Sequence, residues 1–434
     1  MSAVALTGAL GFALTLVLIG FGVPVAVAMA LVGIAGYWWV NDWFGTAYVL
    51  GSAPFEAVFP YSFSVIPLFV MMGVFASRAG LSRSLFDMIN GFFGHLRGGL
   101  AVSSVGASAM FGAICGSSLA TVATIGRVAM PEMRRHGYDD SLSASAVAAG
   151  GTLGVLIPPS ILLVIYGLLT QSSIGQLFMA AIIPGLLGAV FYGIAIVLRV
   201  RMRPELAPPA ARTGWAERLR LFARVWQVLA LFALVIGGIY AGWFSPTEAA
   251  AVGAVGAFAL AALAGRLSLA VLRESMRETA ALTGMIFFIL VGAGLFNNFL
   301  ETTGLPRQLV MLIEASPLTP TTVLILILLF YLVLGCFMDA MSMILLTVPL
   351  LAPVAVGLDI NLILFGILVV TVAEVGLITP PVGMNLFVVQ GTVKDLKLAR
   401  IVRGITPFIL ADILRLALLL AFPALALWLP GQMF

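Results

Sequence analysis

Long apolar runs separated by short polar stretches dominate this chain. The runs lie near residues 4–22, 25–40, 62–77, 98–115, 117–130, 142–170, 176–198, 226–243, 247–264, 280–300, 321–337, 341–357, 361–391 and 404–429. A helix needs about 20 consecutive apolar residues to cross a membrane. Several runs meet that length, whereas others are too short or too broken to cross alone. The pattern predicts an all-α polytopic membrane protein.

Composition agrees with this pattern. Hydrophobic residues make up 62% of the 434 residues and charged residues 9%, whereas a soluble domain carries about 25% charged residues. A soluble enzyme, a nucleic-acid-binding protein, a disordered chain and a disulfide scaffold are therefore excluded. The two cysteines and two histidines have no zinc-site spacing, and the sequence contains no catalytic or phosphate-binding motif. We expect neither an enzyme nor an organic cofactor.

The cationic residues predict an orientation. Cytoplasmic loops of membrane proteins are enriched in Lys and Arg. Most of the 22 cationic residues fall on one side if the N-terminus is periplasmic and residues 98–130 and 321–357 form re-entrant hairpins. Charge alone does not distinguish these hairpins from full crossings. Segment 199–224, with seven arginines, is predicted to be a cytoplasmic linker ending in an amphipathic helix.

The chain contains a hidden repeat. At an offset of 222 residues, Pro24 matches Pro246, Pro131 matches Pro353, and the pair 158–159 matches the pair 380–381. An odd number of crossings before the second copy would invert it. Inverted repeats with broken helices are typical of secondary transporters. The alternative is a chance match of Pro and Gly in apolar sequence.

Both copies carry a double proline after closely spaced glycines, in GGTLGVLIPPS (150–160) and GLITPPVGMN (376–385). Proline has no amide hydrogen and disrupts the preceding helical turn. Backbone carbonyls freed in this way cannot face lipid, so they need a cation, water or buried partners. Such hard oxygen ligands suit Na⁺ in unwound transporter helices. The alternative is a simple kink in each helix.

Small and polar residues interrupt both predicted hairpins, in GAICGSSLATVATIG (112–126) and GCFMDAMSMILLT (335–347). Glycine permits a tight reversal and hydroxyls satisfy exposed amides. Ser117, Ser118, Thr121 and Thr124 could share one helix face. A helix starting at such a tip would direct its positive end at an anion. The alternative is helix packing through small residues.

Asp339 falls at the second tip, because the offset matches it to Ser117. A carboxylate in an apolar run is costly and indicates function. Asp339 could bind Na⁺ or hold a substrate hydroxyl through water, or it could cap a helix. Glu374 could face an ion or proton path, or pair with a nearby hydroxyl.

Two arginines also lie in apolar segments. Arg127 could bind a substrate carboxylate through two hydrogen bonds, or it could reach the cytoplasm near Glu132. Arg415 lies three residues after Asp412 on the last span, and we expect these two side chains to pair.

The segments GSSLATVATIG, PEMRRHGYD, GTLGVLIPPSILLVIYG, GCFMDAM and GLITPPVGMNLFV resemble the large membrane subunit of tripartite ATP-independent periplasmic (TRAP) transporters. The similarity runs over essentially the whole chain. It implies a Na⁺-coupled importer of organic acids that works by an elevator motion in the bacterial inner membrane. It also implies two partners, a periplasmic substrate-binding protein and a small four-span membrane subunit, which we expect to be a separate polypeptide.

The resemblance also implies site residues. One Na⁺ site would use Gly116, Ser117 and Ser118 with Gly151, Thr152, Gly154, Ile157 and Pro158. The other would use Gly335 and Asp339 with Gly376, Thr379 and Pro380. The anionic substrate would contact Ser117, Ser118, Thr121, Arg127, Asp339, Gly383 and Asn385.

The predicted division of the chain alternates between scaffold and transport segments. It comprises scaffold helices in 1–60, half of a transport domain in 61–175, further scaffold helices with the linker in 176–265, the second transport half in 266–403, and a C-terminal span in 404–434. A stand-alone Na⁺/dicarboxylate symporter of similar fold is the nearest alternative. A non-transporting membrane scaffold protein is a more distant one. The sequence does not identify the organic acid.

Overall fold

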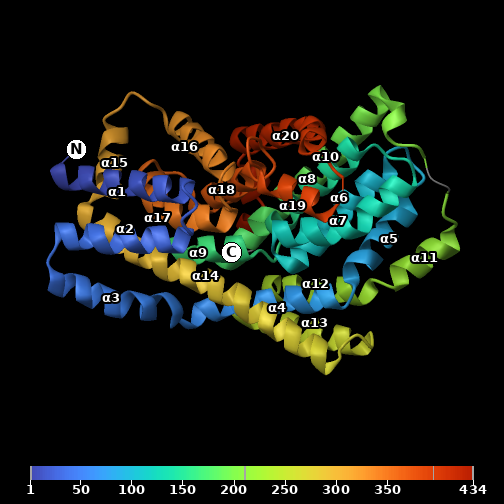
Figure 1. Cartoon of the computed structure of the whole chain (residues 1–434), viewed down its shortest axis with the longest axis horizontal. Helices are drawn as coiled ribbons and strands as arrows, with labels where there is room; N and C mark the ends of the chain where they lie inside the picture. Colours follow the sequence, from blue (N-terminus) through green and yellow to red (C-terminus); the bar gives the residue numbers. More distant parts are fainter. Residues whose placement is uncertain (1, 210–211, 394, 433–434) are drawn as a thin grey trace.

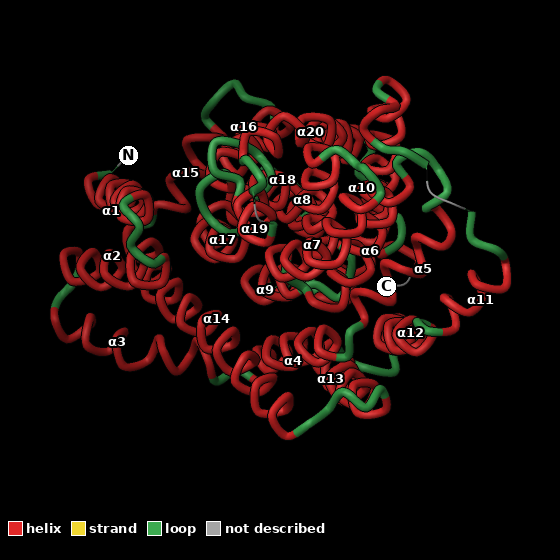
Figure 2. Tube along the Cα trace, turned by 45° about the vertical axis from the view of Figure 1, so that its right-hand side comes forward, coloured by secondary structure: helices red, strands yellow, loops and turns green. Residues whose placement is uncertain are grey.

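The computed structural model describes residues 2–209, 212–393 and 395–432. All regular structure in these ranges is helical (Figure 2). Seven of the helices are long and apolar enough to cross a membrane, or up to nine if each bent pair is one span. The predicted all-helical, polytopic class is confirmed. Residues 210–211 of the predicted linker and 433–434 of the predicted last span lie outside the described ranges.

The first copy of the repeat occupies the N-terminal half. Its helices are α1 (Ala3–Gly20), α2 (Val25–Val40), α3 (Trp43–Val58), α4 (Val65–Arg78), α5 (Leu81–Phe93), α6 (Gly99–Cys115), α7 (Ser118–Arg135), α8 (Asp140–Leu156), α9 (Ile161–Thr170) and α10 (Ile174–Met202), with a 3-10 turn at Tyr61–Ser64. The linker then holds a 3-10 turn (Pro204–Leu206) and α11 (Trp215–Ala223). The amphipathic helix predicted for the linker is therefore present.

The second copy repeats this order. Its helices are α12 (Trp226–Tyr240), α13 (Pro246–Leu263), α14 (Leu269–Thr303), α15 (Leu305–Glu314), α16 (Pro320–Gly335), α17 (Ala340–Gly357), α18 (Leu362–Gly376), α19 (Met384–Thr392) and α20 (Leu398–Ala421), followed by α21 (Ala424–Leu427) and a 3-10 turn (Pro430–Gln432). The helix order thus supports the repeat inferred from the matching prolines.

The copies differ in one helix. The single helix α14 corresponds to the pair α3 and α4, which are interrupted at Pro60. Proline lacks the amide hydrogen that would continue the helix, and the matching position in the second copy is Leu282. The hydropathy pattern missed α3 because Pro54 and Glu56 interrupt it. It missed α5 and α15 because both are short and amphipathic.

The helices form two layers. Helices α2, α3, α4, α13 and α14 run along one side, where α14 packs on α2 and α4, and α13 packs on α4 and α12 (Figure 1). The hairpins α6–α7 and α16–α17 and the broken helices form the other layer. The two copies interlock there, because α19 packs on α7 and α9 packs on α17.

Helix α10 packs on α6, α8, α9, α18 and α20. The sequence-based division grouped this helix with the scaffold, whereas its contacts lie with the hairpins and broken helices.

Glycine pairs hold each hairpin against a broken helix. A Cβ atom added to Gly112 of α6 would lie 2.2 Å from the Cα of Gly154 on α8. In the second copy, a Cβ on Gly376 of α18 would lie 2.5 Å from the Cα of Gly335 on α16. No side chain fits between backbones this close, so the same contact depends on glycine in both copies.

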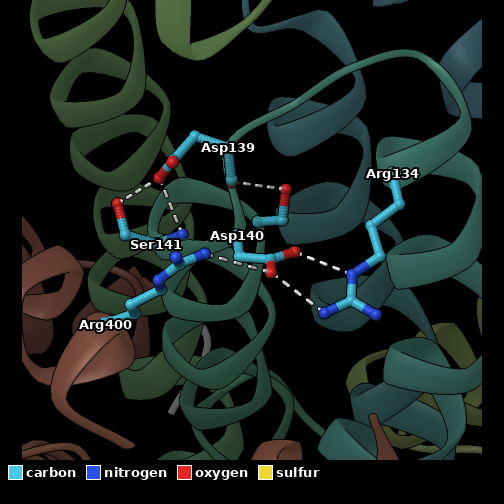
Figure 3. A network of polar contacts seen from close by, with 6 residues as sticks. Arg134, Asp139, Asp140, Ser141 and Arg400 are labelled. Atoms are coloured by element: carbon cyan, nitrogen blue, oxygen red, sulfur yellow. Dashed lines mark hydrogen bonds and ion pairs between the residues drawn. The ribbon is translucent and has the colours of Figure 1, made fainter. Parts of the chain in front are cut away.

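A polar network joins the ends of three helices (Figure 3). Arg134 of α7 donates from Nε to Oδ1 of Asp140 at 2.7 Å and from Nη2 to Oδ2 at 2.9 Å. Arg400 of α20 approaches the same carboxylate at 3.8 Å. Asp139 caps α8 by accepting from the Ser141 amide at 2.8 Å. These contacts fix α7, α8 and α20 relative to one another.

A second network lies fully buried between α8, α10 and α20. Arg415 and Asp412 form an ion pair at 2.8 Å, as the sequence predicted. Tyr192 donates to Asp412 Oδ2 at 2.6 Å, and its hydroxyl lies 3.0 Å from that of Thr152. The network therefore binds α10 and α20 to α8, the helix that precedes the first double proline.

Gly112→Ala tests the glycine contact. The new methyl group would overlap the Gly154 backbone, so we expect a loss of about 1–3 kcal/mol in stability, measured as a lower unfolding temperature in detergent. Gly193→Ala on α10 is the matched control, because no atom lies within 4 Å of its added Cβ. Equal unfolding temperatures for the two variants would contradict the close approach.

Asp412→Ala tests the buried network. It leaves the Arg415 guanidinium buried without its counter-ion, which costs about 3–5 kcal/mol. Glu217→Ala removes an exposed pair with Arg220, which contributes less than about 1 kcal/mol. In detergent, the free energy of unfolding should therefore fall further for Asp412→Ala than for Glu217→Ala, by the difference between these two costs. The double change Asp412→Leu with Arg415→Met should recover much of the lost stability. If it does not, the unpaired Arg415 charge is not the cause of the loss in Asp412→Ala.

Candidate functional site

Both hairpin tips reach one cavity of about 1060 Å³. The first tip contributes Gly116, Ser117 and Ser118 to its wall, and the second contributes Asp339. Ligand cavities commonly enclose ~300–1,000 Å³, so this one has room for a small organic solute. The structure therefore brings together polar residues that are more than 200 positions apart in the sequence.

The first tip is a glycine turn followed by a capped helix. Gly116 has a left-handed backbone with φ of 64°, which glycine adopts without a Cβ clash. Ser117 then caps α7 by accepting from the Ala120 amide at 3.3 Å. A Cβ on Gly116 would lie 3.1 Å from the Ile161 side chain. The tip thus lies on the first residue of α9, directly beside the first helix break.

The second tip uses an acidic cap at the matching position. Asp339 Oδ2 accepts from the Ser342 amide at 2.9 Å, which occupies one of the two carboxylate oxygens. Asp339 is therefore a helix cap and also part of the cavity wall. Gly383 donates from its amide to the Cys336 carbonyl at 3.3 Å. That bond holds the second tip against the second break.

The two double prolines interrupt their helices as predicted. The break between α8 and α9 spans 157–160 and bends the pair by 42°, and the break between α18 and α19 spans 377–383. The bond between the paired prolines is cis in both breaks. Since prolines 158 and 159 have no amide hydrogen, the carbonyls of Gly154 and Val155 lose their helical donors.

In the second break, the carbonyls that lose their helical donors accept other hydrogen bonds. Prolines 380 and 381 leave the carbonyls of Gly376 and Leu377 without helical donors. The Thr379 amide donates to Gly376 at 3.0 Å, and the Asn385 amide donates to Leu377 at 3.0 Å. Both carbonyls thus regain a partner inside the loop. The proline spacing alone predicts two unpaired carbonyls in this longer break, whereas both are hydrogen-bonded within it.

Glu374 connects the two copies across the cavity. This carboxylate on α18 is buried, and Ser118 of the first tip donates its hydroxyl hydrogen to Oε2. Glu374 also lines the cavity, so this carboxylate both pairs with a hydroxyl and faces the cavity. Among the ion pairs of the described residues, none involves Glu374. A buried carboxylate without a cationic side chain favours an external cation or a proton.

Charged residues gather along another part of the cavity wall. Arg78 of α4 pairs with Glu274 at 3.1 Å and Glu278 at 3.0 Å on α14, and all three line the cavity. Arg127 is exposed on the same wall, where a solute can reach its guanidinium. Sequence reasoning missed the Arg78 cluster because its members lie about 200 residues apart.

Several predicted residues lie behind the wall. Thr121 is buried with its hydroxyl unpaired among the described residues, Thr152 bonds to Tyr192, and Asn385 donates to the Ala148 carbonyl at 3.2 Å. Other predicted residues within the described ranges are also absent from the cavity wall, namely Gly151, Gly154, Ile157, Pro158, Gly335, Gly376, Thr379, Pro380 and Gly383. Any part that these residues take in binding would use their backbone atoms or would consist of supporting the tips.

The sequence of this chain is similar to those of known transport proteins. Residues 12–425 match the family described as "Tripartite ATP-independent periplasmic transporter, DctM component". The chain is 38% identical to the C4-dicarboxylate TRAP transporter large permease protein DctM of Pseudomonas aeruginosa, covering 87% of this chain and 88% of that protein. It is 32% identical to the ectoine TRAP transporter large permease protein TeaC of Halomonas elongata, over 96% and 97%.

A further relative is longer than this chain. The isethionate TRAP transporter permease protein DctMQ of Oleidesulfovibrio alaskensis is 32% identical, and the match covers 97% of this chain but 65% of that protein.

Solved structures share the fold. The YdaH transporter of Alcanivorax borkumensis aligns with a TM-score of 0.64 and 16% identity, over 90% of this chain and 91% of that one. MtrF of Neisseria gonorrhoeae aligns with a TM-score of 0.60 and 13% identity, over 88% and 85%. At these identities the likeness extends to the fold alone.

Cysteine labelling tests the cavity wall. Thr124→Cys places a thiol on the wall, whereas Thr121→Cys places one in the buried layer behind it. In a Cys115→Ala background, a small polar thiol reagent should modify position 124 at least about tenfold faster than position 121, because only the former meets water. Equal rates would mean that the cavity is closed or that the wall is assigned incorrectly.

Proposed function

The chain belongs to the DctM family of large permease components of TRAP transporters, and on that premise we propose that it imports an organic acid by Na⁺-coupled secondary transport across the bacterial inner membrane. It is a multi-pass transport protein and not an enzyme. The observation that carries the proposal is the shared cavity, where two hairpin tips and the buried Glu374 meet.

Two Na⁺ sites are proposed at the tips. The first uses Gly116, Ser117 and Ser118 with the break of α8, whose Gly154 and Val155 carbonyls lack helical donors. The second uses Asp339 with Gly335, Gly376, Thr379 and Pro380. Support comes from the contact of each tip with its own break. Oxygen ligands of this kind suit Na⁺ at unwound helices.

The substrate is proposed to lie between the tips. Ser117, Ser118, Asp339 and Arg127 line the space, whereas Thr121, Gly383 and Asn385 would support the wall. The named substrates of the relatives above, C4-dicarboxylates, ectoine and isethionate, all carry a carboxylate or sulfonate. A guanidinium binds oxyanion groups well through paired hydrogen bonds, which supports Arg127 as the anion contact.

An elevator motion is proposed for the layer that holds the site. The moving body would contain both hairpins, both broken helices, α10 and α20, and the opposite layer would form the scaffold. This proposal moves α4 and α14, which the sequence-based division placed in the transport halves, to the scaffold. Support for including α10 comes from its packing on α8 and α20 and from the Tyr192–Asp412 hydrogen bond. With the N-terminus periplasmic, the arginine-rich wall of the cavity would face the cytoplasm.

Two partners are proposed. A periplasmic binding protein would deliver the solute, as the family description implies. A small four-span membrane subunit would complete the permease. The DctMQ relative, which extends well beyond the matched region, supports a close association of the two membrane components.

Uptake into proteoliposomes tests the coupling. Vesicles holding this chain and the small subunit should accumulate an organic acid only when Na⁺ and the binding protein are both present. Replacing Na⁺ with K⁺ should abolish accumulation, because the proposal assigns the coupling to Na⁺ alone. Uptake without Na⁺ would refute the coupling, and uptake without the binding protein would favour the stand-alone symporter.

Asp339→Asn tests the acidic tip. Asparagine is as good a helix cap as aspartate, so this change removes charge and keeps the turn. We expect the Na⁺ concentration for half-maximal uptake to rise roughly tenfold or more, since one charged ligand is worth at least about 1.4 kcal/mol. Asp42→Asn is the matched control, because Asp42 caps α3 in the same way. An unchanged Na⁺ dependence would exclude Asp339 as an ion ligand.

A further inference from the structure

Helix α11 lies at the periphery of the molecule in both views (Figures 1 and 2). Its inner side is docked on α5. Arg218 donates from Nε to the Gly91 carbonyl at 2.9 Å, and its guanidinium lies 5.6 Å from the centre of the Phe92 ring. Leu221 contacts the same turn, 2.7 Å from the position of a Cβ on Gly91. These contacts fix which face of α11 points outward.

The outward face is apolar. Trp215, Leu219 and Phe222 follow one helix stripe and are 72%, 66% and 46% exposed. The Arg218 guanidinium lies 5.0 Å from the centre of the Trp215 ring, yet all three side chains stay exposed. Exposed apolar stripes of this kind on a short helix mark a binding surface.

Cations surround this stripe. Arg212, Arg220 and Arg224 are exposed in or beside α11, and segment 199–224 has seven arginines against two glutamates. An apolar stripe beside arginines, with tryptophan at its edge, is typical of a helix that lies in the lipid headgroup region.

The path of the chain supports the same location. Helix α12 is apolar and continues α11 after a bend of 52°. If α12 enters the bilayer, this bend turns α11 away from the axis of that span. The apolar stripe can then enter the acyl boundary while the arginines remain with the headgroups.

We propose that α11 is a binding site for anionic phospholipid. Trp215, Leu219 and Phe222 insert at the headgroup–acyl boundary, and Arg212, Arg220 and Arg224 bind the phosphates. The interaction anchors the link between α10 and α12 to the membrane surface. The positive charge selects anionic over zwitterionic lipid.

Quenching of Trp215 fluorescence tests the site. The full chain is placed in nanodiscs that contain brominated phosphatidylglycerol or brominated phosphatidylcholine at equal fractions. The difference between wild type and Trp215→Phe isolates the signal of Trp215 from the other tryptophans. We expect quenching by phosphatidylglycerol to exceed that by phosphatidylcholine by about threefold or more.

Charge variants provide the control. The preference should vanish in R212Q/R220Q/R224Q and persist in R273Q/R277Q, which removes two exposed arginines of α14. In wild type it should also fall in 1 M salt, where the Debye length is about 3 Å. Equal quenching by both lipids, or a preference that survives R212Q/R220Q/R224Q, would overturn the proposal. No quenching by either lipid would also overturn it.

Discussion

The need to satisfy backbone groups inside a membrane governs this structure. Each double proline removes two amide donors from a helix within the apolar body, and lipid offers no replacement. The chain responds by placing a hairpin tip against each break. Gly116 lies on the start of α9, and the Cys336 carbonyl accepts from Gly383. The prolines of the first break are thus buried, whereas the second break reaches the cavity wall at Leu377 and is exposed at Pro381.

This arrangement requires very close helix packing. The contacts of Gly112 with Gly154 and of Gly335 with Gly376 bring backbone against backbone just before each break. Larger residues would separate hairpin from broken helix and move the tip away from the unwound segment. The two polar networks act further out. Asp140 joins α7, α8 and α20 at one end, and Asp412 joins α10 and α20 beside Thr152. Packing and polar contacts therefore link the site-bearing helices into one body.

The sequence revealed those features that depend on local chemistry or on the repeat. Double prolines predicted both breaks, the offset matched Ser117 with Asp339, and three-residue spacing predicted the Asp412–Arg415 pair. Contacts between distant segments left no such signal. Nothing local indicates that Ser118 meets Glu374 or that Arg78 meets Glu274, because these depend on how the two copies interlock. Hydropathy also missed α3 and α5, which carry too many polar residues or too few turns to resemble a span.

The interlocking of the copies explains a difference between the two tips. The second tip carries its own carboxylate, Asp339, whereas the first has Ser117 at the matching position. Glu374 lies on the broken helix of the second copy, yet it accepts a hydrogen bond from Ser118 at the first tip. Each tip consequently lies beside one carboxylate. The second tip has Asp339 of its own hairpin, and the first has Glu374 of the other copy. Among the described carboxylates of the cavity wall, Glu274 and Glu278 pair with Arg78, whereas Asp339 and Glu374 are in no ion pair. One such carboxylate lies beside each tip and can be offset by one cation, so the unequal copies provide equal charge for the pair of proposed sites.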